Sequence, residues 1–350
     1  MDTAMKLLPL FRRELELCRV HPNETVGILT QGLERLEYAQ AFSAAAVELG
    51  AKVFHVDLPS YQGAGAELAG RVGQTGLGDH PLVVEAFKQC DLLIDLVFLL
   101  FSKEQLAIQA ANTRILLCVE PPETLARMFP KESDKRRVME QKQMLERAKT
   151  LRFTNDAGTD VTYELGQYPA VAEYGFADDP GHWDHFTSGF AFTGGNDDGV
   201  NGVVVLQPGD IVFPFKRYVQ EPVRFTIHKG RVESIEGGLD ATIISQYMKS
   251  FDDPNAYGIS HIGFGLNERA RWDALVTETR GIGMDGRAFF GNVLFSTGPN
   301  AEIGGTNDTA CHLDIPMCNC SLWLDDVLVV KRGEILVPSL LPNELARSAK

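Results

Sequence analysis

The sequence predicts an α/β fold in which an N-terminal, doubly wound parallel-sheet domain precedes a β-rich α+β metal-binding domain. Strand and helix patterns alternate over residues 1–150, as they do in a parallel sheet covered by helices. Over residues 151–350 the helical periodicity fades, and glycine, proline and short β-rich runs dominate. One of these later runs alternates histidine and aspartate, which predicts two metal ligands on one side of a strand.

In the first domain, short apolar runs predict buried strands and longer amphipathic runs predict helices. The domain ends with a long charged helix at residues 132–149. No GxGxxG motif follows the first strand and no Walker loop occurs, so we expect a scaffold without a bound dinucleotide. The expected strands are residues 26–29, 53–56, 92–97 and 115–119, and the other expected helices are residues 36–49, 82–87 and 104–110.

The second domain begins near Thr150 and is expected to consist mainly of strands, with a helix at residues 240–251. Lys229 and Gly230 form a turn between two apolar runs, which predicts a hairpin. The expected strands are residues 203–206, 211–215, 223–228, 322–330 and 335–337, the last two of them with turns at 325–326 and 332–333.

Composition and charge exclude several classes of protein. The chain has 350 residues, of which 44% are hydrophobic and 23% charged, so it can bury a sizeable core. Its net charge of −14 and the lack of a basic stripe argue against binding to nucleic acid or to an anionic membrane surface. The most apolar run, residues 92–101, contains Asp95 and is shorter than the ~20 residues that span a bilayer.

The cysteines and the N-terminus indicate a compartment. Six cysteines are scattered along the chain, which is not the pattern of a disulfide framework. The first amphipathic stretch has charged residues at positions 12, 13, 14 and 16, so we expect no secretory signal. These features predict a cytoplasmic protein.

The sharpest local signal is the run CHLDIP at residues 311–316. In an extended segment His312 and Asp314 point to the same side, and His261, which lies among small residues, is the best third ligand. We call these three residues the metal triad. Two histidines and one carboxylate leave about three positions open on a metal ion, which suits Fe(II) oxygenases. A buried histidine hydrogen-bonded to a strand aspartate fits the same pattern and stays open as an alternative.

A closed zinc site is a further alternative, because thiolates favour zinc. Its ligands would be Cys311, His312, Cys318 and Cys320. The C-x-C spacing is unusual for such a site, and no CxxC pair occurs. Buried thiols that pack between strands explain these cysteines more simply.

Four further residues could act on a substrate. His185 ends the cluster Gly-His-Trp-Asp-His shortly after Glu173, and the two could form an acid/base unit with His185 poised near neutral pH. A polar loop is the alternative, and it is favoured for His182. Arg287 could bind a carboxylate or an enolate, or form a salt bridge at a sheet edge. Ser296 could hydrogen-bond a ring heteroatom, or satisfy backbone groups.

Five blocks of the chain match a known family in order, at residues 114–123, 134–137, 166–185, 257–266 and 295–316. Together they resemble the 2,5-dihydroxypyridine 5,6-dioxygenases, the ring-cleaving enzymes of bacterial nicotinate-type catabolism. The resemblance extends over nearly the whole chain. That family is similar in fold to the M29-type metallo-aminopeptidases. One departure is Phe101, where a close relative has a histidine.

The resemblance implies an Fe(II) ion held by the metal triad, and a substrate, 2,5-dihydroxypyridine, that O2 opens between C5 and C6 to N-formylmaleamate. It implies four pocket residues: Glu173, His185, Arg287 and Ser296. We expect His185 to act as the base, with Glu173 orienting it. Family members form higher homo-oligomers, so we expect a homo-oligomer here, with a hexamer implied.

The main rival function is hydrolysis by an M29-like metallo-aminopeptidase with zinc or cobalt and a bound water. Paired metal ions would require more acidic residues near His261, where Glu268 is the nearest in sequence. A second rival is a non-catalytic ligand-binding protein on the same scaffold. Metal content separates oxygenase from peptidase, and oxygen uptake with 2,5-dihydroxypyridine would exclude the binding protein.

Overall fold

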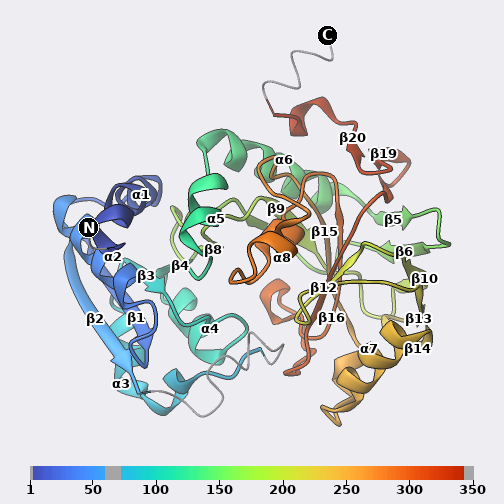
Figure 1. The fold of residues 1–350 in the computed structure, drawn as a ribbon, viewed down its shortest axis with the longest axis horizontal. Helices are drawn as coiled ribbons and strands as arrows, with labels where there is room; N and C mark the ends of the chain where they lie inside the picture. The colour runs from blue at the N-terminus through green and yellow to red at the C-terminus, as the bar shows by residue number, and fades with distance from the viewer. Residues whose placement is uncertain (1–2, 60–71, 343–350) are drawn as a thin grey trace.

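A computed structural model of the chain describes residues 3–59 and 72–342. Figure 1 shows two parts side by side: a parallel sheet with its helices, mostly in blue and cyan, and a strand-rich part in green to red. The strand-rich part is built from antiparallel sheets. This arrangement confirms the predicted fold class.

The parallel sheet has the strand order β2-β1-β3-β4-β8, and every neighbouring pair in it is parallel. Side chains of its central strands alternate between two helical layers. Leu92 and Ile94 pack with helices α1 and α2, whereas Leu93 packs with α3 and α4, so both faces are covered as a parallel sheet requires. The strands are β1 (Thr25–Gln31), β2 (Lys52–Leu58), β3 (Leu92–Asp95), β4 (Arg114–Leu117) and β8 (Trp183–His185).

The expected helices of the first domain are present within a few residues of their predicted ends, and a further helix, α1, precedes them. Phe11 of α1 stacks on Phe42 of α2 with ring centroids 3.9 Å apart. The helices are α1 (Thr3–Leu17), α2 (Leu36–Glu48), α3 (Pro81–Phe87), α4 (Lys103–Ala110), α5 (Pro122–Arg127) and α6 (Glu132–Arg147), with the 3-10 turn η1 (Gly76–Asp79).

Two antiparallel sheets form most of the strand-rich part. The larger has the order β14-β13-β10-β6-β5-β18-β19-β20, and the smaller has the order β17-β16-β15-β9-β7. The strands of the larger sheet are β5 (Thr150–Thr154), β6 (Asp160–Glu164), β10 (Val200–Leu206), β13 (Val223–His228), β14 (Arg231–Gly237), β18 (Ser321–Leu324), β19 (Val327–Lys331) and β20 (Glu334–Ile335). Those of the smaller are β7 (Val171–Glu173), β9 (Phe190–Thr193), β15 (Ile259–Gly265), β16 (Val293–Thr297) and β17 (Leu313–Met317).

The predicted hairpin at Lys229 and Gly230 is confirmed, because β13 pairs with β14 on either side of this turn. The strand expected at residues 211–215 is shorter than predicted, since β11 covers only Ile211–Val212 and Pro214, which has no N–H to donate, follows closely. The remaining elements are β11 (Ile211–Val212), β12 (Arg217–Tyr218), α7 (Leu239–Lys249), η2 (Pro254–Tyr257), α8 (Ala274–Thr277), α9 (Met284–Arg287), η3 (Ala301–Ile303) and η4 (Pro338–Leu340).

The two parts are joined by more than the chain itself. Strand β8 lies after residue 150 in sequence, yet it pairs with β4 in the parallel sheet. Helix α6 lies against the smaller antiparallel sheet, where the Gln141 amide donates to the carbonyls of Ala191 and Phe264 and accepts from the Ala191 N–H. The domain boundary near Thr150 stays a prediction.

Candidate metal centre

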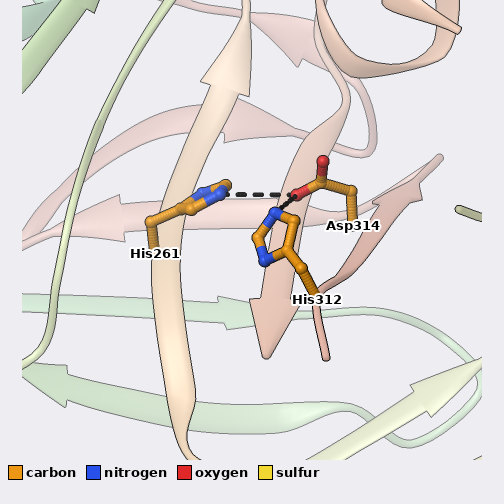
Figure 2. Close-up of side chains that lie close together, drawn as sticks. All are labelled: His261, His312 and Asp314. Carbon is orange, nitrogen blue, oxygen red and sulfur yellow. Dashed lines mark ion pairs between the residues drawn. The ribbon is translucent and has the colours of Figure 1, made fainter. Parts of the chain in front are cut away.

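The metal triad is carried by the smaller antiparallel sheet. His261 is in β15 and Asp314 in β17, with β16 between them, while His312 directly precedes β17. Figure 2 shows the two imidazoles converging on one carboxylate oxygen: Asp314 Oδ1 lies 3.4 Å from His261 Nε2 and 3.2 Å from His312 Nε2. All three side chains are buried. Among residues 3–59 and 72–342, this is the one group of three or more metal-binding side chains.

A β-bulge turns His261 toward the other two residues. The register between β15 and β16 shifts between Ile259 and Ile262, and such a shift interrupts the ladder of backbone hydrogen bonds. Ser296 provides hydrogen-bond partners for the backbone groups at the bulge: its hydroxyl accepts from the His261 N–H and donates to the His261 carbonyl, each at 2.9 Å. In this structure Ser296 therefore satisfies backbone groups beneath a triad histidine, and a contact between Ser296 and substrate stays a prediction.

Hydrogen bonding and charge prepare the triad for a cation. His312 Nδ1 lies 3.1 Å from the Thr297 carbonyl, so Nδ1–H donates there and Nε2 faces Asp314. Burial lowers the pKa of His261, which keeps that ring neutral at neutral pH. Burial opposes ionisation of Asp314, but the nearby His312 and Arg287 hold its pKa well below the usual range.

The donor set fits a metal ion. Asp314 Oδ1 is buried and has no hydrogen-bond partner among the described residues, although buried carboxylate oxygens nearly always have one. It faces two imidazole nitrogens, and a cation between the three atoms would satisfy all of them. Two histidines and one carboxylate, with space on the remaining sides, form the set that non-heme Fe(II) favours.

Arg287 holds the other oxygen of the triad carboxylate. Its Nε donates to Asp314 Oδ2 at 2.6 Å, and its Nη1 donates to the Ile282 carbonyl at 2.7 Å. The guanidinium also lies 4.1 Å from the ring centre of Phe213, within the range of a cation–π contact. The salt bridge considered for Arg287 thus exists, and it orients a triad residue.

The triad forms part of the wall of a cavity with about 660 Å³ of empty space, some of it open to solvent. The cavity lies at the carboxyl ends of β3, β4 and β8, where α/β sheets bind ligands. Its wall is mainly apolar and aromatic, with Phe192 packing on His261 and Phe101 on His312. The other lining residues are Val72, Phe98, Leu100, Leu117, Glu173, Trp183, His185, Phe190, Phe213, Pro214, Ile282, Met284, Arg287, Leu294 and Glu302.

His185 and Glu173 both line this cavity, but their protonation differs from the expectation. Burial lowers the pKa of His185 to about 3, so the ring is neutral rather than poised near neutral pH, and its buried Nε2 has no partner among the described residues. Burial raises the pKa of Glu173 to about 8. Glu173 Oε2 accepts from the Ser188 hydroxyl at 3.0 Å, and no hydrogen bond joins Glu173 to His185 within residues 72–342.

The residues considered as alternatives lie elsewhere. His182 contacts the Tyr174 hydroxyl at 3.0 Å and the Ala172 carbonyl at 3.2 Å, which agrees with a structural role. Cys311, Cys318 and Cys320 are free thiols, and none joins a metal-binding group among the described residues.

A family model described as 2,5-dihydroxypyridine 5,6-dioxygenase (NicX) matches residues 6–337. The chain belongs to this dioxygenase family. A 2,5-dihydroxypyridine 5,6-dioxygenase from Pseudomonas putida is 46% identical over 338 residues, which cover 95% of this chain and 97% of the relative. These matches confirm the resemblance inferred from the sequence.

Solved structures agree with this assignment. A 2,5-dihydroxypyridine dioxygenase from Pseudomonas putida superposes with a TM-score of 0.93 at 45% identity, covering 97% of this chain and 99% of that one. Wild-type AmpT from Thermus thermophilus gives a TM-score of 0.56 at 15% identity, covering 95% and 100% of the two chains. The second likeness shows a shared fold alone.

Two cavity residues that carry a polar group, Trp183 and Glu302, were not singled out from the sequence. Trp183 lines the cavity, and its buried indole N–H has no partner among the described residues. Its position two residues before His185 in β8 could have revealed it, because alternate strand residues share a face. Glu302 lies on η3, and burial together with the nearby Glu173 and Asp314 raises its pKa well above the usual value. No sequence signal marks Glu302.

Within residues 3–59 and 72–342, no helix combines the length and apolar character that a bilayer span requires.

Proposed function

We propose that this chain is an Fe(II)-dependent, extradiol-type ring-cleaving dioxygenase that opens 2,5-dihydroxypyridine between C5 and C6 with O2, giving N-formylmaleamate. The observation that supports this most is the metal triad: two imidazoles and one carboxylate oxygen without a hydrogen-bond partner face one point in the wall of an aromatic cavity. Membership of the dioxygenase family supports the choice of substrate.

The triad would hold the iron through His261, His312 and Asp314 Oδ1. When bound, Fe(II) supplies open positions at which substrate and dioxygen can meet, and a path for electrons between them. Asp314 Oδ2 is occupied by Arg287, so one carboxylate oxygen is left for the ion. Because both histidines and the aspartate are buried, the site excludes most of the water that would compete for these positions.

Two residues outside the metal triad would engage the hydroxyl groups of the substrate. His185 is neutral at neutral pH because burial lowers its pKa to about 3, so its free Nε2 can accept a hydrogen bond from the 5-hydroxyl but is too weak a base to take its proton fully. Glu173, protonated because burial raises its pKa, can donate a hydrogen bond to a ring oxygen while Ser188 holds its other side. Glu173 thus acts beside His185 rather than through a direct bond to it.

Arg287 would orient the substrate as well as Asp314. Its Nε and Nη1 are engaged, and Nη2 makes no hydrogen bond to the described residues. A guanidinium with one free edge in an aromatic cavity suits an anionic ring oxygen. The two hydroxyls of 2,5-dihydroxypyridine lie para to each other, so one metal ion cannot chelate both, and side chains must hold the far edge of the ring.

The direct test is oxygen uptake after anaerobic loading with Fe(II). We expect one O2 consumed per 2,5-dihydroxypyridine, and a product that retains both atoms of isotopically labelled dioxygen. Hydroquinone, which lacks the ring nitrogen, serves as the matched control substrate. Absence of uptake by iron-replete protein would refute the proposal, whereas cleavage of both rings at equal rates would refute the pyridine preference.

The structure offers less support for the metallo-aminopeptidase alternative. Paired-metal hydrolases need bridging carboxylates, and the one cluster among the described residues contains a single aspartate. A metal assay separates the two functions: about one iron per chain is expected for the oxygenase, and two zinc ions for the peptidase.

We also propose that the protein is a cytoplasmic homo-oligomer, with a hexamer expected from the family resemblance. Light scattering coupled to size exclusion measures the assembly directly. A monomer at micromolar concentration would contradict this proposal without affecting the metal site.

A further inference from the structure

The loop before Arg287 is held by a buried carboxylate from the other part of the molecule. Glu120 follows β4 of the parallel sheet and is 1% exposed. Its Oε2 accepts from the Ile282 N–H at 3.0 Å, and its Oε1 accepts from the N–H groups of Gly283 at 3.1 Å and Met284 at 2.9 Å. Three consecutive backbone donors therefore converge on one side chain, which fixes the path of the loop.

This loop fits Glu120 and Phe213 closely. A Cβ on Gly281 would lie 2.5 Å from Glu120 Oε2, and a Cβ on Gly283 would lie 2.2 Å from the Phe213 ring. Gly283 also has φ +105°, a conformation that side chains disfavour. The two glycines thus let the backbone approach the carboxylate and the aromatic ring. This close packing fixes the position of the loop from which the Arg287 side chain extends.

Hydrogen bonds connect this loop to the metal triad. The Ile282 N–H is bound by Glu120, and the Ile282 carbonyl accepts from Arg287 Nη1. Arg287 Nε then donates to Asp314 Oδ2. A continuous series of hydrogen bonds therefore leads from the end of β4 to the triad carboxylate, and the side chains of Ile282 and Met284 on the same loop line the cavity.

We propose that Glu120 is a positioning residue, which sets the geometry of Arg287, and through it the orientation of Asp314, by holding the 282–284 backbone. The expected effect of Glu120 on turnover rests on the proposed function, whereas its expected effect on the geometry of Arg287 does not. Glu120 is neither a member of the triad nor itself a lining residue of the cavity, so it acts through the backbone of the loop.

A second contact to the same region supplies a matched control. Glu278 accepts from the Thr124 hydroxyl and from Arg127, and so it also joins the α5 region to the segment before Arg287. It does not bind the 282–284 backbone. A generic loosening of this interface would affect Glu278→Gln and Glu120→Gln alike, whereas positioning through the loop affects only Glu120→Gln.

The test measures hydrogen exchange of the Arg287 Nε–H by nitrogen-15 NMR, with the resonance assigned by its loss in Arg287→Lys. In Glu120→Gln the amide NH2 opposes backbone donors, so we expect exchange of the Arg287 Nε–H to rise about tenfold or more. For the iron-loaded enzyme we expect kcat/KM for 2,5-dihydroxypyridine to fall by about tenfold, with iron content unchanged. Glu278→Gln should leave both quantities within about threefold of the parent.

Unchanged exchange in Glu120→Gln, or an equal rise in Glu278→Gln, would overturn the assignment. If Glu120→Gln does not fold, Gly281→Ala displaces the same loop without altering charge and must give the same rise; unchanged exchange there would also overturn it. The exchange measurement needs no turnover. Increased exchange in a protein inactive on the dihydroxypyridine would therefore support the role of Glu120 while refuting the proposed reaction.

Discussion

The two sheets that meet at the cavity contribute to it in different ways. The parallel sheet offers residues at its strand ends, such as Leu117 at the end of β4 and His185 at the end of β8. The smaller antiparallel sheet offers His261 and Asp314 from within its strands, and a bulge and two-residue alternation bring them together with His312, which directly precedes β17. Under the proposed function, the antiparallel side would hold the metal ion, and the parallel side would shape the cavity beside it and hydrogen-bond the substrate.

This division of roles predicts that substitution of the metal triad abolishes metal binding. Asp314→Ala removes the single carboxylate of the triad and leaves Arg287 without its ion-pair partner, so we expect loss of both bound iron and turnover. Metal analysis and oxygen uptake measure these. Asp240→Asn, at a buried aspartate that accepts from the Gln220 and Glu221 N–H groups, is the control and should retain iron. An iron-replete, active Asp314→Ala protein would refute the division.

On the parallel side, His185→Ala should retain iron and slow kcat by about 10²-fold, because it removes the proposed hydrogen-bond acceptor for the 5-hydroxyl. His182→Ala is the matched control, since His182 lies three residues earlier and contacts Tyr174 rather than the cavity. Steady-state kinetics on iron-quantified samples distinguishes the two variants. Unchanged turnover in His185→Ala would remove this histidine from the mechanism.

Glu173, at the end of β7 in the smaller antiparallel sheet, should make the stability of the protein depend on pH. Its pKa is raised by burial from 4.5 to about 8, so between these values only the folded chain retains the proton. The free energy of unfolding therefore falls as pH rises through this window, by roughly 1.4 kcal/mol per pH unit from this group. Urea titrations of metal-free protein at pH 5 and pH 8 should show a smaller difference for Glu173→Gln. If the parent and Glu173→Gln show an equal difference in unfolding free energy, Glu173 is not the group that causes the pH dependence.

The smallest effect is expected for Trp183→Phe. This change removes the unpartnered indole N–H but retains an aromatic wall. If the indole N–H donates one modest hydrogen bond to the bound substrate, its loss should raise KM by roughly threefold, with kcat and iron content unchanged. Loss of iron in Trp183→Phe would show that the two sides of the cavity are not separable.

The sequence was informative where one local pattern determines the geometry. Alternation at the start of β17 places Asp314 on the same side as His312, which directly precedes the strand, and the hairpin at Lys229 and Gly230 follows from its turn residues. The fold class followed from the change from alternating helices and strands to short strands.

Other features depend on contacts that no local pattern records. β8 has three residues, two of them polar or charged, and joins the parallel sheet only because the chain returns to β4. Ser296 engages the His261 backbone because of a bulge, which depends on the pairing of β15 with β16. The low pKa of His185 and the raised pKa of Glu173 arise from burial by both parts of the chain, and burial is a property of the folded structure.

X-ray absorption spectroscopy of anaerobically Fe(II)-loaded protein tests the central claim most directly. The metal triad predicts about one iron per chain, with two imidazoles and otherwise oxygen ligands in its coordination sphere. Sulfur ligands, a second metal ion at close range, or a spectrum unchanged in His261→Ala would contradict it.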